Sequence, residues 1–537
     1  MNSGRPYSDS FTFLEGMERY WATIGSNRAY LLKNVDFFRS LATVRDGIIA
    51  IWWSTAGAQI YGMGIIKKET GDILCRIAGN KFQRLVSNTW TDVTTLSGSY
   101  PASMESFSWP DNTGAAFTSG TITAANTRSI SATGYTNYAQ LVGKYIVITS
   151  WPAIWDTKLV ASATASEIFI EGTFNVLPTG TDTFQIRNRA DHVYVTNGVD
   201  PFMMYDGTNV TTFPNSKRFH YLAANNNRLY GARNDEDILT FSDLGTGYFS
   251  TENTIPIDQD GDQITGMVSN QDRLVVYKQY SRFLLTGWTP ELFNLRRMES
   301  NKGSIAPLSI VNGNNLQFFL SDEGIEMFNF LEQSSLDEAL PISLIIGDMI
   351  SAHSTAEKKA AISWVDDNKL HLQIWSTVYV YHIAHSDIMR SQVFSVYEYP
   401  GTVQYATRLQ GKAYIAINGV TYTIGGTTDN GVPIEVEMIT NRRTQSGKED
   451  YRQNKLYLRT YFEFERPSVN TDVTFSMAHN GSALVVKKVV NIRDKWNTTK
   501  VDYSHRATDI QAGFSFSTSE KIRFIHGSVE YNVAPHL

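Results

Sequence analysis

The amino-acid sequence predicts an all-β protein, and three observations support that fold class. The chain of 537 residues is rich in aromatic side chains (12%), which favour β-strands. Short apolar segments alternate in hydropathy and are bounded by turn residues such as Asn-Gly. These segments recur along most of the chain, and repetition at a fixed period indicates one structural unit used many times.

The repeated unit is a polar turn residue, a short apolar strand, a tight turn and a second strand. From the second member onwards, successive members begin 36 to 53 residues apart. A period of about 40–45 residues, with four short strands in each repeat, is typical of propeller blades. We therefore predict a β-propeller of six to eight blades. The seven members are Asp46–Trp53, Asp191–Gly207, Asn227–Phe241, Asp272–Gly287, Asn315–Phe330, Asn368–Ile383 and Gly411–Gly426.

Individual turns can also be predicted. In the last member, Asn418-Gly419 separates two alternating segments, and this pair favours the positive φ angles of a type I′ hairpin turn. One short helix is expected over Ser354–Ala361, with Ser354 as its N-terminal cap.

Composition changes divide the chain into domains. The first two repeat members start 145 residues apart, and residues 107–190 between them are rich in Ser, Thr, Ala and Gly. Five short strands there predict a small β-barrel or sandwich inserted into the propeller. The propeller then comprises residues 41–106 and 191–428. Longer strands without the repeat predict a C-terminal β-sandwich over 429–537, and residues 1–40 are assigned to an N-terminal arm.

The charge and cysteine content exclude several classes of protein. With 47 basic and 53 acidic residues, the chain is not a globally basic nucleic-acid binder. A single cysteine, Cys75, excludes an internal disulfide framework and predicts a buried, unreactive thiol. The polar start of the chain does not resemble a signal peptide, and no apolar run of about 18 residues predicts a membrane span.

Two polar clusters are candidate sites. Asp258, Asp260 and Asp262 alternate and could converge on calcium, but the EF-hand pattern fails and a solvated loop between blades is the favoured interpretation. A basic cluster could contact nucleic acid or an acidic partner, or could simply keep a loop solvated. Its candidate contact residues are Arg442, Arg443, Arg452 and Lys455.

Catalytic signals are weak. The chain has no P-loop, no G-x-S-x-G elbow and no H-E-x-x-H motif, so no catalytic or cofactor-binding residue is assigned and no enzymatic activity is predicted. The histidines His371, His382 and His385 form the only cluster of that residue type, and their spacing disfavours a shared metal. Five tryptophans could line a sugar groove, but such residues are more often core or interface anchors. They are Trp52, Trp53, Trp109, Trp151 and Trp155.

Several segments resemble the propeller proteins of phage tails, which are described as nozzle, hub or DNA-stabilisation proteins. The segment Tyr221–Phe249, with R-L-Y followed by S-D-L-G, precedes a D-G-D-x-I-T sequence within Ile255–Gly287. The motifs TNGVDPFMMYDGT at Thr196–Thr208 and FLSDEGIEMF at Phe319–Phe328 are similar to segments of the same family. The resemblance is good between about residues 193 and 330. Phe241 stands where the family usually has Trp.

The resemblance implies a structural virion protein of a phage tail, assembled in the host bacterial cytoplasm. Copies would form a ring, with six the expected number, that continues the DNA channel, retains the packaged genome and opens for ejection. Its partners would be portal or adaptor proteins, tail fibres and genomic DNA that passes without sequence recognition. The alternative is a propeller that binds or hydrolyses host glycans, which would need a pair of carboxylates at one end of the channel.

Overall fold

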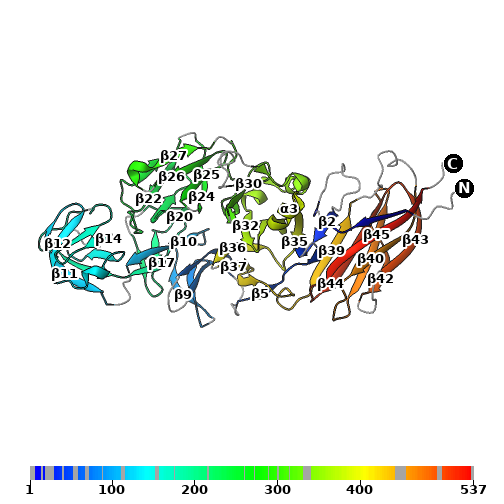
Figure 1. The fold of residues 1–537 in the computed structure, drawn as a ribbon, viewed down its shortest axis with the longest axis horizontal. Coiled ribbons are helices and arrows are strands. Elements are labelled where there is room, and N and C mark those ends of the chain that lie inside the picture. The colour runs from blue at the N-terminus through cyan, green and yellow to red at the C-terminus, as the bar shows by residue number, and fades with distance from the viewer. Residues whose placement is uncertain are drawn as a thin grey trace. The chain divides into compact units, whose positions relative to one another are not determined.

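A computed structural model describes residues 7–13, 16–17, 29–38, 41–51, 58–66, 72–87, 89–110, 115–150, 156–174, 176–213, 217–258, 261–270, 272–287, 289–298, 301–313, 315–329, 340–409, 411–441, 455–492 and 499–533. The chain is mostly β (Figure 1). It divides into two compact units. One unit is Ser54–Ile305, and the other combines Met1–Trp53 with Ala306–Leu537.

The unit Ser54–Ile305 contains four antiparallel sheets of four strands each among its described residues. Each sheet is a meander, as expected of a propeller blade. The first has β6 (Ile60–Ile66), β7 (Ile73–Ala78), β8 (Lys81–Val86) and β9 (Thr89–Thr95); the second has β10 (Ser103–Pro110), β17 (Arg189–Thr196), β18 (Met203–Tyr205) and β19 (Val210–Thr212). The third has β20 (Tyr221–Asn225), β21 (Arg228–Ala232), β22 (Ile238–Phe241) and β23 (Thr254–Pro256); the fourth has β24 (Ile264–Asn270), β25 (Arg273–Lys278), β26 (Arg282–Thr286) and β27 (Asn294–Arg297), which follows the short 3-10 helix η2 (Pro290–Leu292).

Neighbouring blades of this unit pack face to face. Ile77 of the first sheet and Val193 of the second lie in one buried cluster, and Tyr194 of the second lies with Leu222 of the third in another. A further cluster joins the third sheet to the fourth. Apolar residues therefore line both faces of the inner sheets, which explains why their strands read as nearly continuous apolar runs.

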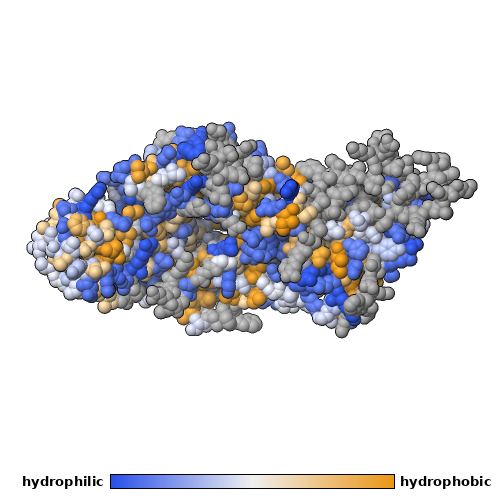
Figure 2. Space-filling model, viewed as in Figure 1, coloured by the Kyte–Doolittle hydropathy of each residue, from blue (hydrophilic) through white to orange (hydrophobic). Residues whose placement is uncertain are grey.

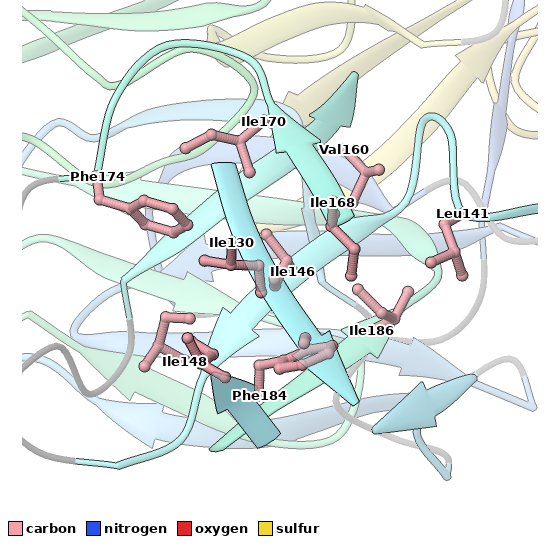
Figure 3. Close-up of a cluster of buried hydrophobic side chains, with 12 residues drawn as sticks. Ile130, Leu141, Ile146, Ile148, Val160, Ile168, Ile170, Phe174, Phe184 and Ile186 are labelled. Carbon is pink, nitrogen blue, oxygen red and sulfur yellow. The ribbon is translucent and has the colours of Figure 1, made fainter. Parts of the chain in front are cut away.

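A closed six-stranded barrel is inserted between β10 and β17, which pair directly with each other. Its hydrophobic core is filled by branched aliphatic side chains and two phenylalanines, Phe174 and Phe184 (Figure 3). Five strands were expected here; the additional strand is β12, a short Ser-containing segment with a weak apolar signal. In barrel order the strands are β11 (Thr118–Ala125), β12 (Ser129–Thr133), β15 (Glu167–Ile170), β14 (Thr157–Ala163), β13 (Tyr145–Ile148) and β16 (Thr183–Arg187), with the 3-10 helix η1 (Tyr138–Gln140) before β13.

The second unit has three more blade-like sheets among its described residues. Trp364 and Ile415 lie in the shared core of the last two of them. The first has β28 (Val311–Gly313), β29 (Leu316–Leu320), β30 (Ile325–Asn329) and β31 (Leu340–Pro341), after η3 (Pro307–Ser309). The second has β32 (Ile362–Asp366), β33 (Lys369–Ile374), β34 (Thr377–His382) and β35 (Phe394–Tyr397); the third has β36 (Val403–Leu409), β37 (Lys412–Ile417), β38 (Val420–Ile424) and β5 (Ile48–Ala50).

The strand β5 comes from the N-terminal part of the chain, yet it completes the blade formed by β36–β38. The described residues of the sequence segment Asp46–Trp53 therefore supply a single outer strand of this blade. The prediction of a mostly β chain with repeated four-stranded antiparallel sheets is confirmed.

Two larger sheets end this unit. The blade β32–β35 continues through β2 (Ala29–Lys33) into β39 (Ile434–Thr440), β44 (Ile510–Thr518), β41 (Asp472–His479) and β42 (Val485–Asn491). The other sheet has β3 (Val35–Phe38), β4 (Leu41–Val44), β45 (Arg523–Val533), β40 (Lys455–Phe464) and β43 (Thr499–Ala507), and β1 (Tyr7–Phe11) also pairs with β45. Phe462 of one sheet stacks on Phe475 of the other, with ring centroids 5.8 Å apart.

The N-terminal residues, which the sequence assigned to an arm, supply strands to both of these sheets. β2 pairs with β35 on one side and with β39 on the other. The sequence does not indicate this role, because a strand that lacks the repeat has no periodic signal.

The helices are short. α2 (Thr355–Lys359) confirms the predicted helix, and Ser354 forms a capping box with Glu357. Besides η1, η2 and η3, the described helices also include η4 (Leu344–Ile346), α1 (Gly347–Ser351) and α3 (Ile383–Met389). None of the helices in the described ranges is long and apolar enough to cross a membrane.

Hydrophobic and hydrophilic residues are interspersed on the face of the molecule that Figure 2 shows.

The predicted type I′ turn provides a test of how local sequence sets the fold. Asn418 and Gly419 have φ angles of 49° and 77°. Gly419→Ala should lower the free energy of unfolding by about 1 kcal/mol, because a side chain at positive φ clashes with the backbone. Gly513→Ala is the control, since the nearest atom to its added Cβ is at an ordinary 3.5 Å. Equal thermal shifts for the two variants would contradict this explanation.

Candidate functional site

The alternating carboxylates of the proposed calcium site bind protein groups. The Asp262 carboxylate accepts hydrogen bonds from the backbone N–H groups of Gln279 (3.1 Å) and Tyr280 (2.8 Å). The Asp258 carboxylate lies 3.5 Å from the Arg297 guanidinium. Asp260 lies outside the described residues. No group of three metal-ligating side chains occurs in the part of the chain that the structure describes.

The basic cluster is only partly placed. Arg442, Arg443 and Arg452 lie outside the described residues. Lys455, at the start of β40, is fully buried and has a partner within the protein, so it does not present its charge to a ligand. Of the tryptophans considered for a sugar groove, none has a described side chain.

The three clustered histidines are brought close to β3, but as packed side chains. His382 Nε2 lies 2.7 Å from Ser395 Oγ, and its Nδ1 lies 3.4 Å from an Asp36 oxygen. His385 stacks on Phe37, with centroids 4.6 Å apart. It lies in α3 rather than in a strand. His371 stacks on Trp364 at 4.9 Å, and its ring nitrogens have no hydrogen-bond partner among the described residues.

Cys75 is buried, as predicted. Burial raises the pKa of its thiol to about 12, which keeps it protonated at neutral pH. The thiolate is the reactive form of cysteine, so this residue is a packing group.

The inserted barrel packs against the loop Ser242–Gly247, hereafter the docking loop, which carries no catalytic motif. Lys158 of β14 reaches the loop with its Nζ 2.8 Å from an Asp243 carboxylate oxygen and 3.5 Å from Asp156. The other Asp243 oxygen accepts a hydrogen bond from Asn253 Nδ2 at 2.8 Å. The Lys158 side chain is only 4% exposed, so its charge is neutralised inside the contact.

A hydrogen bond and apolar packing complete the contact between the barrel and the docking loop. Tyr145 of β13 donates its hydroxyl hydrogen bond to the carbonyl of Gly245. Gly245 has φ +73°, and a Cβ added there would lie 2.2 Å from a Leu159 methyl group. Glycine is therefore required both by the backbone conformation and by the close approach of the barrel. The S-D-L-G sequence noted for its family resemblance is the loop that holds the barrel on its blade.

A second polar centre joins the N-terminal strands to the blade β32–β35 and to the C-terminal sheet. Arg45 is fully buried, and its guanidinium binds both carboxylate oxygens of Asp429, at 2.9 and 2.6 Å. It also donates to Asn34 Oδ1 at 2.8 Å and to the carbonyls of Asp46 (2.7 Å) and Glu398 (2.6 Å). All five N–H donors of the guanidinium thus have an acceptor.

Next to Arg45 lies a buried ion pair between Asp36 of β3 and Lys369 of β33, with Nζ and Oδ2 2.7 Å apart. Burial alone would raise the pKa of Asp36, but the hydrogen bond from His382 and the charge of Lys369 lower it well below its usual range. Burial lowers the pKa of His382 and lowers that of His371 strongly, with Lys369 adding to the effect on His371. The cluster is therefore stable with neutral imidazoles and an ionised carboxylate.

Comparisons with known proteins extend only to the fold. No family model and no curated protein matches the chain. Among solved structures, the chain is similar to BamB from Moraxella catarrhalis (13% identity, TM-score 0.34, over 72% of this chain and 92% of that one). It is also similar to the gluconolactonase XC5397 from Xanthomonas campestris (12% identity, TM-score 0.29, over 44% and 82%). Both similarities are distant ones to β-propeller proteins.

The ion pair at the docking loop can be tested by mutation. Lys158→Ala should lower the free energy of unfolding by about 3 kcal/mol, because Asp156 and Asp243 would remain buried without their cation. Lys144→Ala, which removes a half-buried barrel lysine bonded to Asn188, should change it by less than about 1 kcal/mol. Chemical denaturation measures both, and equal effects would show that the docking contact does not depend on Lys158.

The histidine cluster predicts acid sensitivity. Because the folded-state pKa values of His371 and His382 lie below 6.5, their contribution to stability is complete above pH 6.5 and is lost as the pH falls below it. Asp36 adds a further loss below its ordinary pKa of 3.8. The midpoint temperature of thermal unfolding should therefore decrease as the pH is lowered from 7 to 5.

His371→Phe keeps an aromatic ring against Trp364 and removes the buried basic nitrogens, so it should flatten that decline. His505→Phe, at a half-buried strand position away from Asp36, is the control and should leave the decline unchanged. If the thermal midpoint of His371→Phe decreases with pH as steeply as that of the wild type, other groups cause the acid sensitivity.

Proposed function

We propose that this chain is a structural protein of a phage tail, a nozzle or hub, without enzymatic activity. Copies assemble into a ring of six that continues the DNA channel, retains the packaged genome and opens for ejection. Portal or adaptor proteins and tail fibres are its partners, and the genomic DNA passes through without sequence recognition. The protein is made in the bacterial cytoplasm and becomes part of the virion tail.

The observation that carries this proposal is the role of the motif residues that resemble the phage-tail family. Their hydrogen bonds and ion pairs hold loops and strands of the fold together. The S-D-L-G sequence forms the docking loop for the barrel. In the T-N-G-V-D-P motif, the Asp200 carboxylate accepts hydrogen bonds from the N–H (3.1 Å) and hydroxyl of Ser97, which precedes β10. Asn197 in turn binds Asp200 at 2.7 Å. Motif residues with structural contacts of this kind are what we expect of a protein with a structural function.

The Y-D-G-T and F-L-S-D motifs follow the same pattern. Asp206 accepts hydrogen bonds at 2.7 Å from the backbone N–H groups of Thr208 and Asn209, which closes the turn between β18 and β19. Ser321 accepts from the backbone N–H of Gly324 at 3.2 Å and closes the turn between β29 and β30. Motif residues used in this way mark an architecture rather than a reaction.

Charge and symmetry are compatible with a channel protein. The net charge is −6, and an acidic surface repels DNA and so prevents the exiting genome from adhering. Copies that join through two different surfaces close into a ring when the rotation between neighbours divides a full turn.

Light scattering on the purified protein, alone and with its virion neighbours, tests the proposal. We expect a particle of about six times the 60.3 kDa chain mass, or a monomer that forms such a ring only on the portal–adaptor complex. The number of copies in the ring is read directly from the mass.

A chain that stays monomeric with those neighbours and releases reducing sugar from host polysaccharide would contradict the proposal. That result would favour the glycan-active alternative and direct attention to the carboxylates.

A further inference from the structure

The strand β42 (Val485–Asn491) forms one edge of the nine-stranded sheet (Figure 1). Its inner side pairs with β41, and no strand in the described part of the chain pairs with its outer side. An edge strand exposes backbone N–H and C=O groups that can accept a further strand. Most such edges are kept short or polar for that reason.

β42 is unusually apolar for an edge. Val485, Val486 and Val489 are 55%, 59% and 56% exposed, and five consecutive residues of the strand are exposed. β-branched residues favour the extended conformation, so the strand is preorganised for pairing. Exposed apolar side chains on a free strand edge are typical of surfaces that bind another protein.

The charge of the strand indicates which partner fits. Lys487 and Lys488 lie between the valines, are exposed, and form no ion pair with any described residue. The register passes from Ser476↔Val486 to Phe475↔Lys488, so a β-bulge accommodates Lys487. Bulges and lysines on an edge discourage indiscriminate pairing.

A second copy of the same strand fits poorly. Antiparallel pairing of two β42 strands about their centre would bring the four lysines together, and like charges on facing strands are destabilising. A strand that places a carboxylate opposite Lys487 or Lys488 would instead form an ion pair there and cover part of the exposed valine surface.

We propose that β42 is a docking site for an extended segment of another protein, one that carries apolar residues interspersed with Glu or Asp and adds to the sheet as a further strand. Backbone hydrogen bonds supply affinity in this mode of recognition, and side chains supply specificity. The proposal depends on the C-terminal sheet alone and is independent of the role suggested for the whole chain in a phage tail.

Fluorescence anisotropy with labelled peptides on the full chain tests this assignment. The probe is the soluble, strand-forming peptide VEVEVEVE, and the matched control peptide is VKVKVKVK. We expect saturable binding of the glutamate peptide, at least tenfold tighter than that of the lysine peptide and weakened by salt. Hydrogen exchange should show protection of residues 485–491 when the glutamate peptide is added.

Charge reversal provides the decisive variant. In the double substitution Lys487→Glu and Lys488→Glu, both changes are at exposed positions, so the fold should be retained, which circular dichroism checks. The preference should reverse, with VKVKVKVK now the tighter ligand. Failure of the wild type to bind either peptide, or an unchanged preference after charge reversal, would overturn the proposal.

The valines are tested separately. Val486→Thr together with Val489→Thr keeps β-branched side chains but removes apolar contact area, and should weaken binding of VEVEVEVE about tenfold. Val469→Thr, at a residue that is 50% exposed elsewhere in the C-terminal region, should leave binding unchanged. Equal binding by all three proteins would show that the peptide does not contact the β42 edge.

Discussion

The second unit depends on one buried cation. Arg45 contacts segments that are far apart in the sequence: Asn34 at the end of β2, Glu398 after β35, and Asp429 before β39. Burying a guanidinium is costly unless every donor is satisfied, and here every donor has an acceptor. The rings of Tyr397 and Tyr399 also lie 5.7 and 4.6 Å from the guanidinium carbon. A displaced segment would leave a buried N–H group of Arg45 without its acceptor. The hydrogen bonds of Arg45 therefore fix the positions of these segments relative to one another.

The same physical principle operates at the inserted barrel. Lys158 brings a charge to the docking loop, and Asp156 and Asp243 neutralise it where water has little access. A buried ion pair adds little net stability compared with well-packed apolar side chains, but it fixes the relative position of two surfaces, because a displaced charge would be left without a partner. Gly245 supports this by letting Leu159 approach the loop backbone. Buried ion pairs of this kind connect sheets that otherwise pack through apolar side chains.

Much of the local structure could be predicted from the sequence, but little of the candidate sites could. Alternation of apolar residues identified most blade strands, and Asn418-Gly419 and Ser354 were recognised as a turn and a cap from chemistry that acts within a few residues. β12 was missed because serine and threonine weaken its apolar signal. The carboxylate triplet Asp258–Asp262 suggested a metal, yet the described carboxylates bind the backbone of a neighbouring turn and Arg297. The docking loop was noted only as a family motif, since nothing local shows that a barrel packs on it.

The sequence by itself determined the strands, their turns and the period that makes them blades, because hydrophobic alternation and turn propensity act over short distances. Only the tertiary structure decided which distant segments share a sheet. It places β5 beside β38, β2 between β35 and β39, and Arg45 against Asp429. Among the described strands, it also left the outer edge of β42, with its exposed valines, unpaired. Strand partners are chosen by backbone hydrogen bonds and by the satisfaction of buried charges, and neither depends on proximity along the chain.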